Sequence, residues 1–344
     1  MNPIIMFLML ASLATGTIIT MSSTHWLMAW IGLELNTLSI IPVISKHHHP
    51  RSTEATTKYF LTQAAASAML LFASTVNAWH TGTWDISQLT YQPACIMLTM
   101  ALSMKLGLAP LHFWLPEVLQ GTSLSTALII VTWQKLAPIA LMFLTHSSLD
   151  PSILITMGLL STLIGGWGGL NQTQVRKIMA FSSIAHLGWM TTVMTLNPNL
   201  ALLNLLLYLL MTTTTFMMLM QTTSKTIKDL TTASTLSPST LALMMALMMS
   251  LGGLPPLTGF LPKWLILQEL ANHNFPTTAL MMALSALLSL FFYLRLSYVS
   301  TLTTFPPTTN MTYKWRLQPT SPTHPMTMML LASTLLLPIT PLLL

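Results

Sequence analysis

Residues 107–117 read GLAPLHFWLPE, and residues 253–263 read GLPPLTGFLPK. The two stretches share Gly, Leu, Pro, Leu, Leu and Pro at six of eleven positions, with an offset of 146 residues. Each stretch places glycine and proline inside a long apolar segment. Because proline lacks a backbone N–H and clashes with the preceding turn, we expect one helix break near Pro110 and another near Pro256. The sequence therefore predicts an internal repeat built around two broken helices.

The composition is that of a membrane protein. Only 6% of the 344 residues are charged, 53% are hydrophobic and the mean hydropathy is +0.67, whereas soluble domains carry about 25% charged residues. A helix of about 20 apolar residues crosses a bilayer. Eleven such helices are predicted, at residues 4–22, 25–45, 58–79, 94–117, 123–145, 152–170, 177–195, 200–220, 241–269, 276–299 and 325–343.

The repeat organises these helices. Residues 1–146 and 150–298 each hold five of them, and 325–343 is left as a C-terminal helix. Since five is odd, the two copies enter the membrane from opposite sides, which is the inverted-topology arrangement of many transporters. We therefore expect an all-α polytopic membrane protein in which residues 1–344 form one membrane domain.

The positive charges predict how the chain is oriented. The connections after helices 1, 3, 5, 7 and 9 contain no Lys or Arg. Nine of the 13 cations fall in the alternate connections: Lys46, Arg51, Lys58, Arg176, Lys177, Lys225, Lys228, Lys314 and Arg316. By the positive-inside rule, these connections and the N-terminus lie on the inner side. The net charge of +6 is thus a topology signal, and no nucleic-acid partner is expected.

Four ionisable residues lie in the middle of apolar spans: Glu34, Lys105, Lys135 and Lys263. Such a group at the bilayer centre costs about 2.5–3.5 kcal/mol on insertion scales, so a span that keeps one usually uses it. Burial favours the neutral form of a lysine and a nearby carboxylate favours the charged form, so a lysine whose partner moves away can release its proton. Glu34 is the expected counter-ion. The alternatives are a structural ion pair for Glu34 and snorkelling to the membrane surface for Lys263.

Two histidines are candidate proton relays, namely His186 within the seventh helix and His112 beside the first break. A hydrogen-bonded core histidine would explain His186 equally well. The run His47–His49 is not expected to bind a metal ion, because three consecutive side chains cannot converge on one ion from regular structure. Arg295 is predicted to be an interface anchor.

Several chemistries are not expected of this chain. Its one cysteine, Cys95, excludes an intrachain disulfide framework and a cysteine-ligated iron–sulfur cluster. No Gly-rich dinucleotide fingerprint, P-loop or paired histidines for a haem are present, and no cleavable signal stands out. The sequence therefore predicts neither a bound cofactor nor a metal site.

The chain resembles the mitochondrial NADH-ubiquinone oxidoreductase chain 2 family, the antiporter-like membrane subunits of respiratory complex I. The residues that carry the resemblance extend over the whole chain: MNPII (1–5), HWLMAWIGLELN (25–36), PRSTEATTKYFLTQA (50–64), MALSMKLGLAPLHFWLPEV (100–118), TWQKLAPI (132–139), IGGWGGLNQTQVRKIMAFSSIAHLGWM (164–190) and LGGLPPLTGFLPKW (251–264). The high methionine content also suits a mitochondrial gene.

The resemblance implies a proton-pumping subunit of the inner mitochondrial membrane, with its N-terminus in the matrix. It places the family's intramembrane glutamate at Glu34, its lysine partner at Lys105, the central lysine at Lys135 and the second broken-helix lysine at Lys263. NADH, FMN, iron–sulfur clusters and ubiquinone would be handled by other subunits. The implied partners are the other membrane-arm subunits, including neighbouring antiporter-like ones, and membrane lipids.

Two other functions remain open on the sequence. One is a free-standing cation/proton antiporter, since that family shares the inverted repeat and the buried lysines. The other is a structural or quinone-binding membrane subunit without a proton path. These readings differ in whether the chain purifies alone or in a large assembly, and in whether neutralising the buried charges changes turnover.

Overall fold

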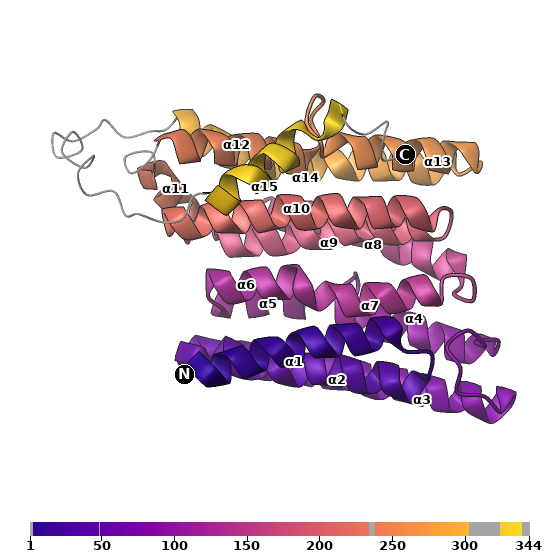
Figure 1. Cartoon of the computed structure of the whole chain (residues 1–344). Helices are drawn as coiled ribbons and strands as arrows, with labels where there is room; N and C mark the ends of the chain where they lie inside the picture. Colours follow the sequence, from indigo (N-terminus) through magenta and orange to yellow (C-terminus); the bar gives the residue numbers. More distant parts are fainter. Residues whose placement is uncertain (1–2, 48, 234–237, 303–323, 339–344) are drawn as a thin grey trace. The chain divides into compact units, whose positions relative to one another are not determined.

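The computed structural model describes residues 3–47, 49–233, 238–302 and 324–338, and nearly all of them are helical (Figure 1). The first half contains α1 (Pro3–Ser22), α2 (Trp26–Ile44), a 3₁₀ turn (Ser45–His47), α3 (Pro50–Thr81), α4 (Gln92–Leu106), α5 (Trp114–Gly121), α6 (Leu124–Val131) and α7 (Trp133–Leu144). The second contains α8 (Pro151–Gly169), α9 (Val175–Met194), α10 (Pro198–Thr222), α11 (Ile227–Ala233), α12 (Pro238–Gly252), α13 (Phe260–Asn272), α14 (Pro276–Leu302) and α15 (His324–Leu335).

Proline marks where many of these helices begin. Its missing N–H is harmless in the first turn, and its fixed φ suits the first helical position. Proline is the first residue of α1, α3, α8, α10, α12 and α14. Proline therefore marks the N-termini of six helices, and Pro110 and Pro256 lie in the two breaks between helices.

The chain divides into two compact units. Unit 1 comprises Met1–Ser161 and Thr191–Pro198, and unit 2 comprises Thr162–Met190 and Asn199–Leu344. The predicted repeats of residues 1–146 and 150–298 meet close to this division. Their superposition by an inverting rotation stays a prediction.

In unit 1, α1 and α2 lie side by side and approach closely through glycine (Figure 1). A Cβ added to Gly16 would lie 2.9 Å from the carbonyl oxygen of Gly32, and one added to Gly32 would lie 2.8 Å from that of Gly16. Small residues let membrane helices pack backbone to backbone. This pair therefore fixes the spacing of α1 and α2, and α3 packs in turn against α2, α4 and α5.

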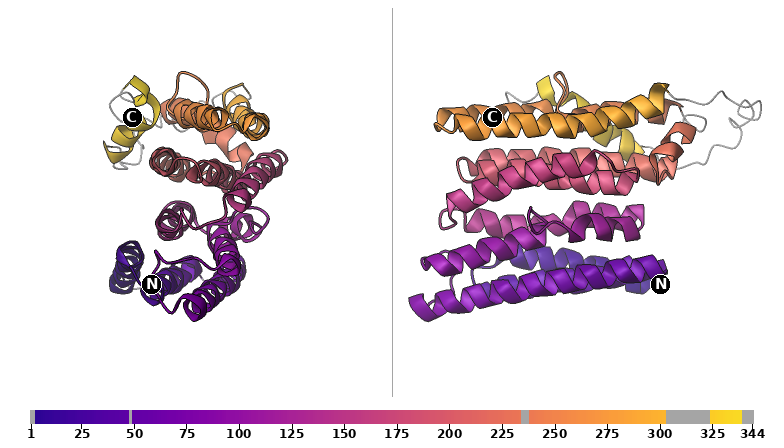
Figure 2. Two further views of the ribbon diagram at one scale, coloured as in Figure 1. Left: turned by 90° about the vertical axis from the view of Figure 1, so that its right-hand side faces the viewer. Right: turned by 180° about the vertical axis from the view of Figure 1, so that it is seen from behind.

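In unit 2, the glycines of α8 serve two neighbours. Gly165 lies against the backbone of Ala185 in α9, whereas Gly166 lies against Leu288 in α14. The long helix α14 also packs along both α12 and α13 (Figure 2). Arg295 of α14 donates hydrogen bonds to the carbonyl oxygens of Leu170 and Gln172, just beyond the end of α8. This arginine therefore ties α14 to α8.

The two predicted helix breaks are confirmed. Between α4 and α5 the chain leaves the helix at Gly107 with φ of 78°, and between α12 and α13 it leaves at Gly253 with φ of 80°. In the first break the N–H of Leu108 donates to the carbonyl oxygen of Ser103 at 2.9 Å, and 146 residues later the N–H of Leu254 donates to that of Met249 at 3.3 Å. The Ala109–Pro110 and Pro255–Pro256 peptide bonds are both cis.

Three predicted elements differ in detail from the structure. The span 123–145 is interrupted at Thr132, which separates α6 from α7. The C-terminal helix, predicted at residues 325–343, ends at Leu335, shortly before Pro338, and residues 339–343 of the prediction lie outside the described residues. The predicted polar connection 221–240 contains the short helix α11, which begins with a capping box between Thr226 and Asp229.

Within the described part of the chain, seven helices are long and apolar enough to cross a membrane: α1, α2, α3, α8, α10, α14, and α6 with α7 taken as one span. The predicted total of eleven spans is not confirmed. Helix α3 begins at Pro50 instead of residue 58, so Arg51 and Lys58 belong to its first turns. Lys314 and Arg316 lie outside the described residues.

Two antiparallel bridges join connections that the charge pattern assigns to the same side. His25, at the predicted outer end of the second helix, pairs with Asp85 of a predicted outer connection, and Gln174 pairs with Thr226 between predicted inner connections. An even number of spans separates the members of each pair, as the prediction requires. The assignment of either side to a compartment stays a prediction.

Candidate proton-translocation site

Unit 1 contains a small, partly open cavity that is lined by two of the predicted lysines. Its volume, measured as the space open to the centre of a water-sized sphere, is about 10 Å³, roughly what one water molecule needs. Five helices and the start of α5 contribute its lining: Leu33, Asn36, Thr37, Tyr59, Gln63, Lys105, Leu106, Trp114, Ile130, Gln134, Lys135 and Pro138. The structure therefore brings Lys105 and Lys135 together around one polar space.

Lys105 lies in the last turn of α4, immediately before the first break, and is 6% exposed. Its ammonium nitrogen is buried and has no hydrogen-bond partner among the described residues. A buried charge without a partner costs several kcal/mol, unless water reaches it or it gives up its proton. The cavity beside it supplies the space for such a water.

Lys135 follows the interruption at Thr132 and is 3% exposed. The hydroxyl of Thr132 donates to the carbonyl oxygen of Leu128 at 2.7 Å, so the side chain satisfies the end of α6. Pro138 inside α7 has no N–H to donate to the carbonyl four residues earlier. That carbonyl belongs to Gln134, directly before the second lysine.

Uncharged polar side chains complete the cavity. The Tyr59 hydroxyl donates to Gln134 Oε1 at 3.5 Å, and Gln134 Nε2 donates to the carbonyl oxygen of Asn36 at 3.4 Å. The side-chain oxygen and nitrogen of Asn36 are both buried without a hydrogen-bond partner among the described residues. Because buried polar groups are normally hydrogen-bonded, Asn36 and Lys105 together indicate a hydrated site.

Glu34 lies on α2 near this cavity, although it is not part of the lining. Its Oε2 accepts a hydrogen bond of 3.3 Å from Thr37, and its side chain is half-buried. The carboxylate interacts electrostatically with Lys105 and Tyr59. The three ion pairs between described residues do not include Glu34, so the predicted pairing with Lys105 is through space and not a direct contact within 4.0 Å.

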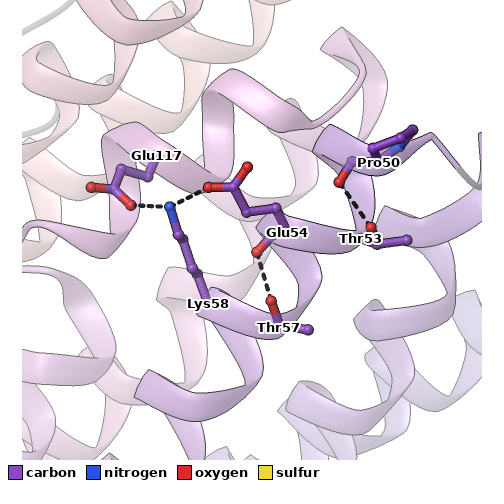
Figure 3. Close-up of polar contacts among 6 residues, drawn as sticks. All are labelled: Pro50, Thr53, Glu54, Thr57, Lys58 and Glu117. Carbon is purple, nitrogen blue, oxygen red and sulfur yellow. Dashed lines mark hydrogen bonds and ion pairs between the residues drawn. The ribbon is translucent and has the colours of Figure 1, made fainter.

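The carboxylate at the second half of this break has a different partner. Glu117 of α5 lies 2.7 Å from the ammonium of Lys58, which also contacts Glu54 at 2.5 Å (Figure 3). All three side chains are substantially exposed. This cluster therefore joins α3 to α5 outside the cavity.

Unit 2 contains a second small cavity, also of about 10 Å³. It is lined by Ala185, His186, Trp189, Lys263, Ser289 and Tyr293. Lys263 lies in α13, and its ammonium donates to the carbonyl oxygens of Gly252 at 2.8 Å and Leu251 at 3.4 Å. The lysine therefore caps the C-terminal end of α12 across the break, where a cation also suits the helix dipole.

The two candidate relays lie in different surroundings. His186 lines the second cavity together with Lys263, and its ring lies 5.4 Å from that of Tyr208. His112 lies inside the first break, hydrogen-bonds the Pro110 backbone and has its ring 4.4 Å from that of Phe113 at a tilt of 32°, but it does not line the first cavity. Among the described residues, which omit His48, no group of three or more His, Cys, Asp or Glu could hold a metal ion.

Two family models cover nearly the whole chain. One described as NADH:quinone oxidoreductase/Mrp antiporter, TM, matches residues 23–289, and one described as NADH dehydrogenase subunit 2 C-terminus matches residues 290–344. The chain is 59% identical to NADH-ubiquinone oxidoreductase chain 2 of Varanus timorensis over 342 residues, which is 99% of each protein.

The chain belongs to the NADH-ubiquinone oxidoreductase chain 2 family.

Further comparisons agree with membership of the chain 2 family. The relative from Salmo salar is 56% identical over 341 residues, covering 99% of this chain and 98% of that protein. A chain of respiratory complex I from Thermus thermophilus with bound aureothin superposes with a TM-score of 0.82 at 26% identity, covering 98% of this chain and 80% of that one. A chain of the Mrp complex from Dietzia sp. DQ12-45-1b shares the fold, with a TM-score of 0.76 at 17% identity over 87% of this chain and 61% of that one.

Sequence reasoning about this chain 2 family member missed the neutral part of the site. Asn36, Gln63, Gln134 and Trp114 line the first cavity, yet none carries a charge that would attract attention in an apolar span. A usable signal was spacing, because Asn36 lies two residues after Glu34 and Gln134 lies directly before Lys135. Polar residues within two positions of an intramembrane charge are therefore candidates for the same site.

Proposed function

We propose that this chain is the antiporter-like core membrane subunit of mitochondrial respiratory complex I that moves protons from the matrix to the intermembrane space. Electron transfer from NADH to ubiquinone in other subunits would drive the movement. The observation that carries the proposal is the pair of small polar cavities, each of which is lined by a lysine at a broken helix. Family membership and the fold shared with a complex I chain support the same conclusion.

In this proposal Lys105 and Lys135 exchange a proton through water in the first cavity. Glu34 sets the charge balance from a distance, so a conformational or charge signal from the rest of the complex changes the proton affinity of Lys105. Lys263 and His186 serve the second cavity in the same way. The free energy at stake is sufficient, since each tenfold change in proton affinity corresponds to about 1.4 kcal/mol.

The proposal extends to the surroundings of the chain. The inner mitochondrial membrane is the expected location, with the N-terminus on the matrix side as the loop cations predict. Other membrane-arm subunits, including neighbouring antiporter-like ones, and membrane lipids are the expected partners. NADH, FMN, iron–sulfur clusters and ubiquinone are assigned to other subunits, so this chain contributes proton movement and no redox step.

The test uses Lys135→Ala and Glu34→Gln in the fully assembled complex, reconstituted in vesicles. Both variants are expected to pump fewer protons per NADH oxidised, while the hydrophilic part keeps its activity with an artificial electron acceptor. Lys46→Ala, which removes an exposed lysine from the same unit, is the control and should pump normally. Normal pumping by both site variants would instead support a scaffold role without a proton path.

A further inference from the structure

The carbonyl oxygens at the end of α4 receive an unusual donor. The oxygen of Ser103 accepts from the backbone N–H groups of Gly107 and Leu108, both at 2.9 Å. The oxygen of Met104 accepts weakly from the backbone N–H of Gly107, at 3.3 Å, and more closely from the indole N–H of Trp114, the first residue of α5, at 3.0 Å. A side chain from the second half of the broken helix thus caps the first half.

Trp114 is held in this position by its neighbours. Its ring meets that of Tyr59 edge-on, with centroids 5.7 Å apart and planes at 67°. A Cβ on Gly107 would lie only 3.4 Å from the indole, so the glycine leaves the ring its space. Trp114 also lines the same cavity as Lys105. The indole is therefore a fixed wall of the proton site as well as a cap.

In the second break, the last carbonyl oxygens of the helix are capped by a group other than an indole. The residue 146 positions after Trp114 is Phe260, whose side chain has no N–H to donate. There the ammonium of Lys263 donates to the last carbonyl oxygens of α12 instead. A lysine near a helix C-terminus readily makes such bonds. Lys105, in the last turn of α4, makes none among the described residues.

We infer that Trp114 is a positioning residue that keeps the Lys105 ammonium off the end of its own helix and in the cavity. Its neutral N–H occupies the Met104 carbonyl that would otherwise attract the lysine. Because the helix end is satisfied, the Lys105 ammonium interacts with water and with the Glu34 carboxylate, and it can pass its proton through that water to Lys135. This inference rests on the proposed function, because positioning matters only if Lys105 carries protons.

The test is Trp114→Phe, which keeps an aromatic ring and removes the donor. In the assembled, reconstituted complex we expect a loss in protons pumped per NADH comparable to that of Lys105→Met, with assembly and artificial-acceptor activity unchanged. Trp79→Phe makes the same chemical change at a ring that is 89% exposed, and it should pump normally.

A double variant separates positioning from a structural role. Trp114→Phe should cause no further loss in a Lys105→Met background, whereas a general packing defect would lower activity in both backgrounds. Normal pumping by Trp114→Phe alongside impaired Lys105→Met would overturn the inference and leave the proposed function standing. Normal pumping by Lys105→Met itself would overturn the proposed function.

A measurement on the unaltered complex covers the case in which Trp114→Phe does not assemble. A density map that resolves side chains and ordered water should place the Trp114 indole on the Met104 carbonyl, with Lys105 free of the carbonyl oxygens of its last turn. A hydrogen bond from Lys105 to one of those oxygens would refute the inference.

Discussion

The two helix breaks share a backbone and differ in the group that caps them. Both begin with a glycine at φ near 80° and repeat the same hydrogen-bond pattern 146 residues apart. In the first break a neutral indole bonds to the helix end, and the lysine ammonium has no partner among the described residues. In the second, the ammonium itself bonds to the helix end. The two breaks therefore share a backbone conformation, and the capping side chain determines whether the nearby lysine hydrogen-bonds to the helix end.

The two lysines also lie on opposite sides of their breaks along the chain. Lys105 belongs to the helix before the first break, whereas Lys263 belongs to the helix after the second. The position that matches Lys263 in the first copy is Glu117, and it pairs with an exposed lysine outside the cavity. Equivalent positions in the repeat have thus taken different roles, although each unit keeps a polar cavity of similar size.

Among substitutions that compare the two breaks, Gly253→Ala is expected to cause the largest loss of stability and proton pumping. An alanine there needs a left-handed backbone, which costs about 1–2 kcal/mol, and its Cβ would lie 2.8 Å from Lys263 Cδ and 2.9 Å from Nζ. We expect a loss of stability together with reduced proton pumping, because the lysine must leave its carbonyl partners. Thermal unfolding and proton counts in the assembled complex measure the two effects.

Gly107→Ala is the matched variant in the first break. It has the same backbone cost, but its Cβ would meet only Leu115 and Trp114, at 3.3 Å and 3.4 Å. Its effect should therefore be smaller, about 1–2 kcal/mol from the backbone alone. If Gly107→Ala were the more damaging of the two, the claim that Lys263 depends on its position against Gly253 would fail.

A smaller effect is expected from Glu117→Gln, at the position that matches Lys263. Its partner Lys58 is exposed and keeps Glu54, and an exposed ion pair contributes about 0–1 kcal/mol. Proton pumping should be unchanged in the assembled complex, and the melting temperature should fall by no more than a few degrees. A loss of pumping would mean that the two positions share a function after all.

The smallest effect is expected at Asp229, in unit 2 but in neither break. Backbone N–H groups of Thr226 and Lys225 hold the pKa of this carboxyl below its usual range. A lowered pKa means that the carboxylate stabilises α11 at neutral pH and stops doing so as the pH falls through the folded-state value. Asp229→Asn should speed amide exchange in α11 at neutral pH, converge with the unaltered chain in acid, and leave pumping intact. Unchanged exchange would contradict the capping assignment.

The breaks could be predicted from sequence because glycine and proline act through the local backbone. Gly107 followed by Pro110, and Gly253 followed by Pro256, combine a left-handed backbone with a missing N–H donor, whereas a lone proline such as Pro138 stays within its helix. Charge in an apolar span pointed equally directly to Lys105 and Lys135, since burial of charge is costly wherever it occurs. Local rules of this kind transfer from one chain to another.

The remaining features depend on tertiary contacts that sequence does not encode locally. No property of Trp114 itself shows that its N–H will reach Met104, ten residues earlier, across a break. The interruption at Thr132 has no glycine or adjacent proline to mark it. Likewise the distance between Glu34 and Lys105 depends on how α2 packs against its neighbours, so a direct pair could be expected but not established.

The central claim is that lysines at the two broken helices carry protons. The most direct test counts protons pumped per NADH oxidised by the assembled, reconstituted complex that carries Lys105→Ala or Lys263→Ala, beside the exposed-lysine control Lys46→Ala. The account predicts a lower count for each site variant, with artificial-acceptor activity retained and the control normal. A normal count in both site variants would contradict it and reduce the two lysines to structural polar groups.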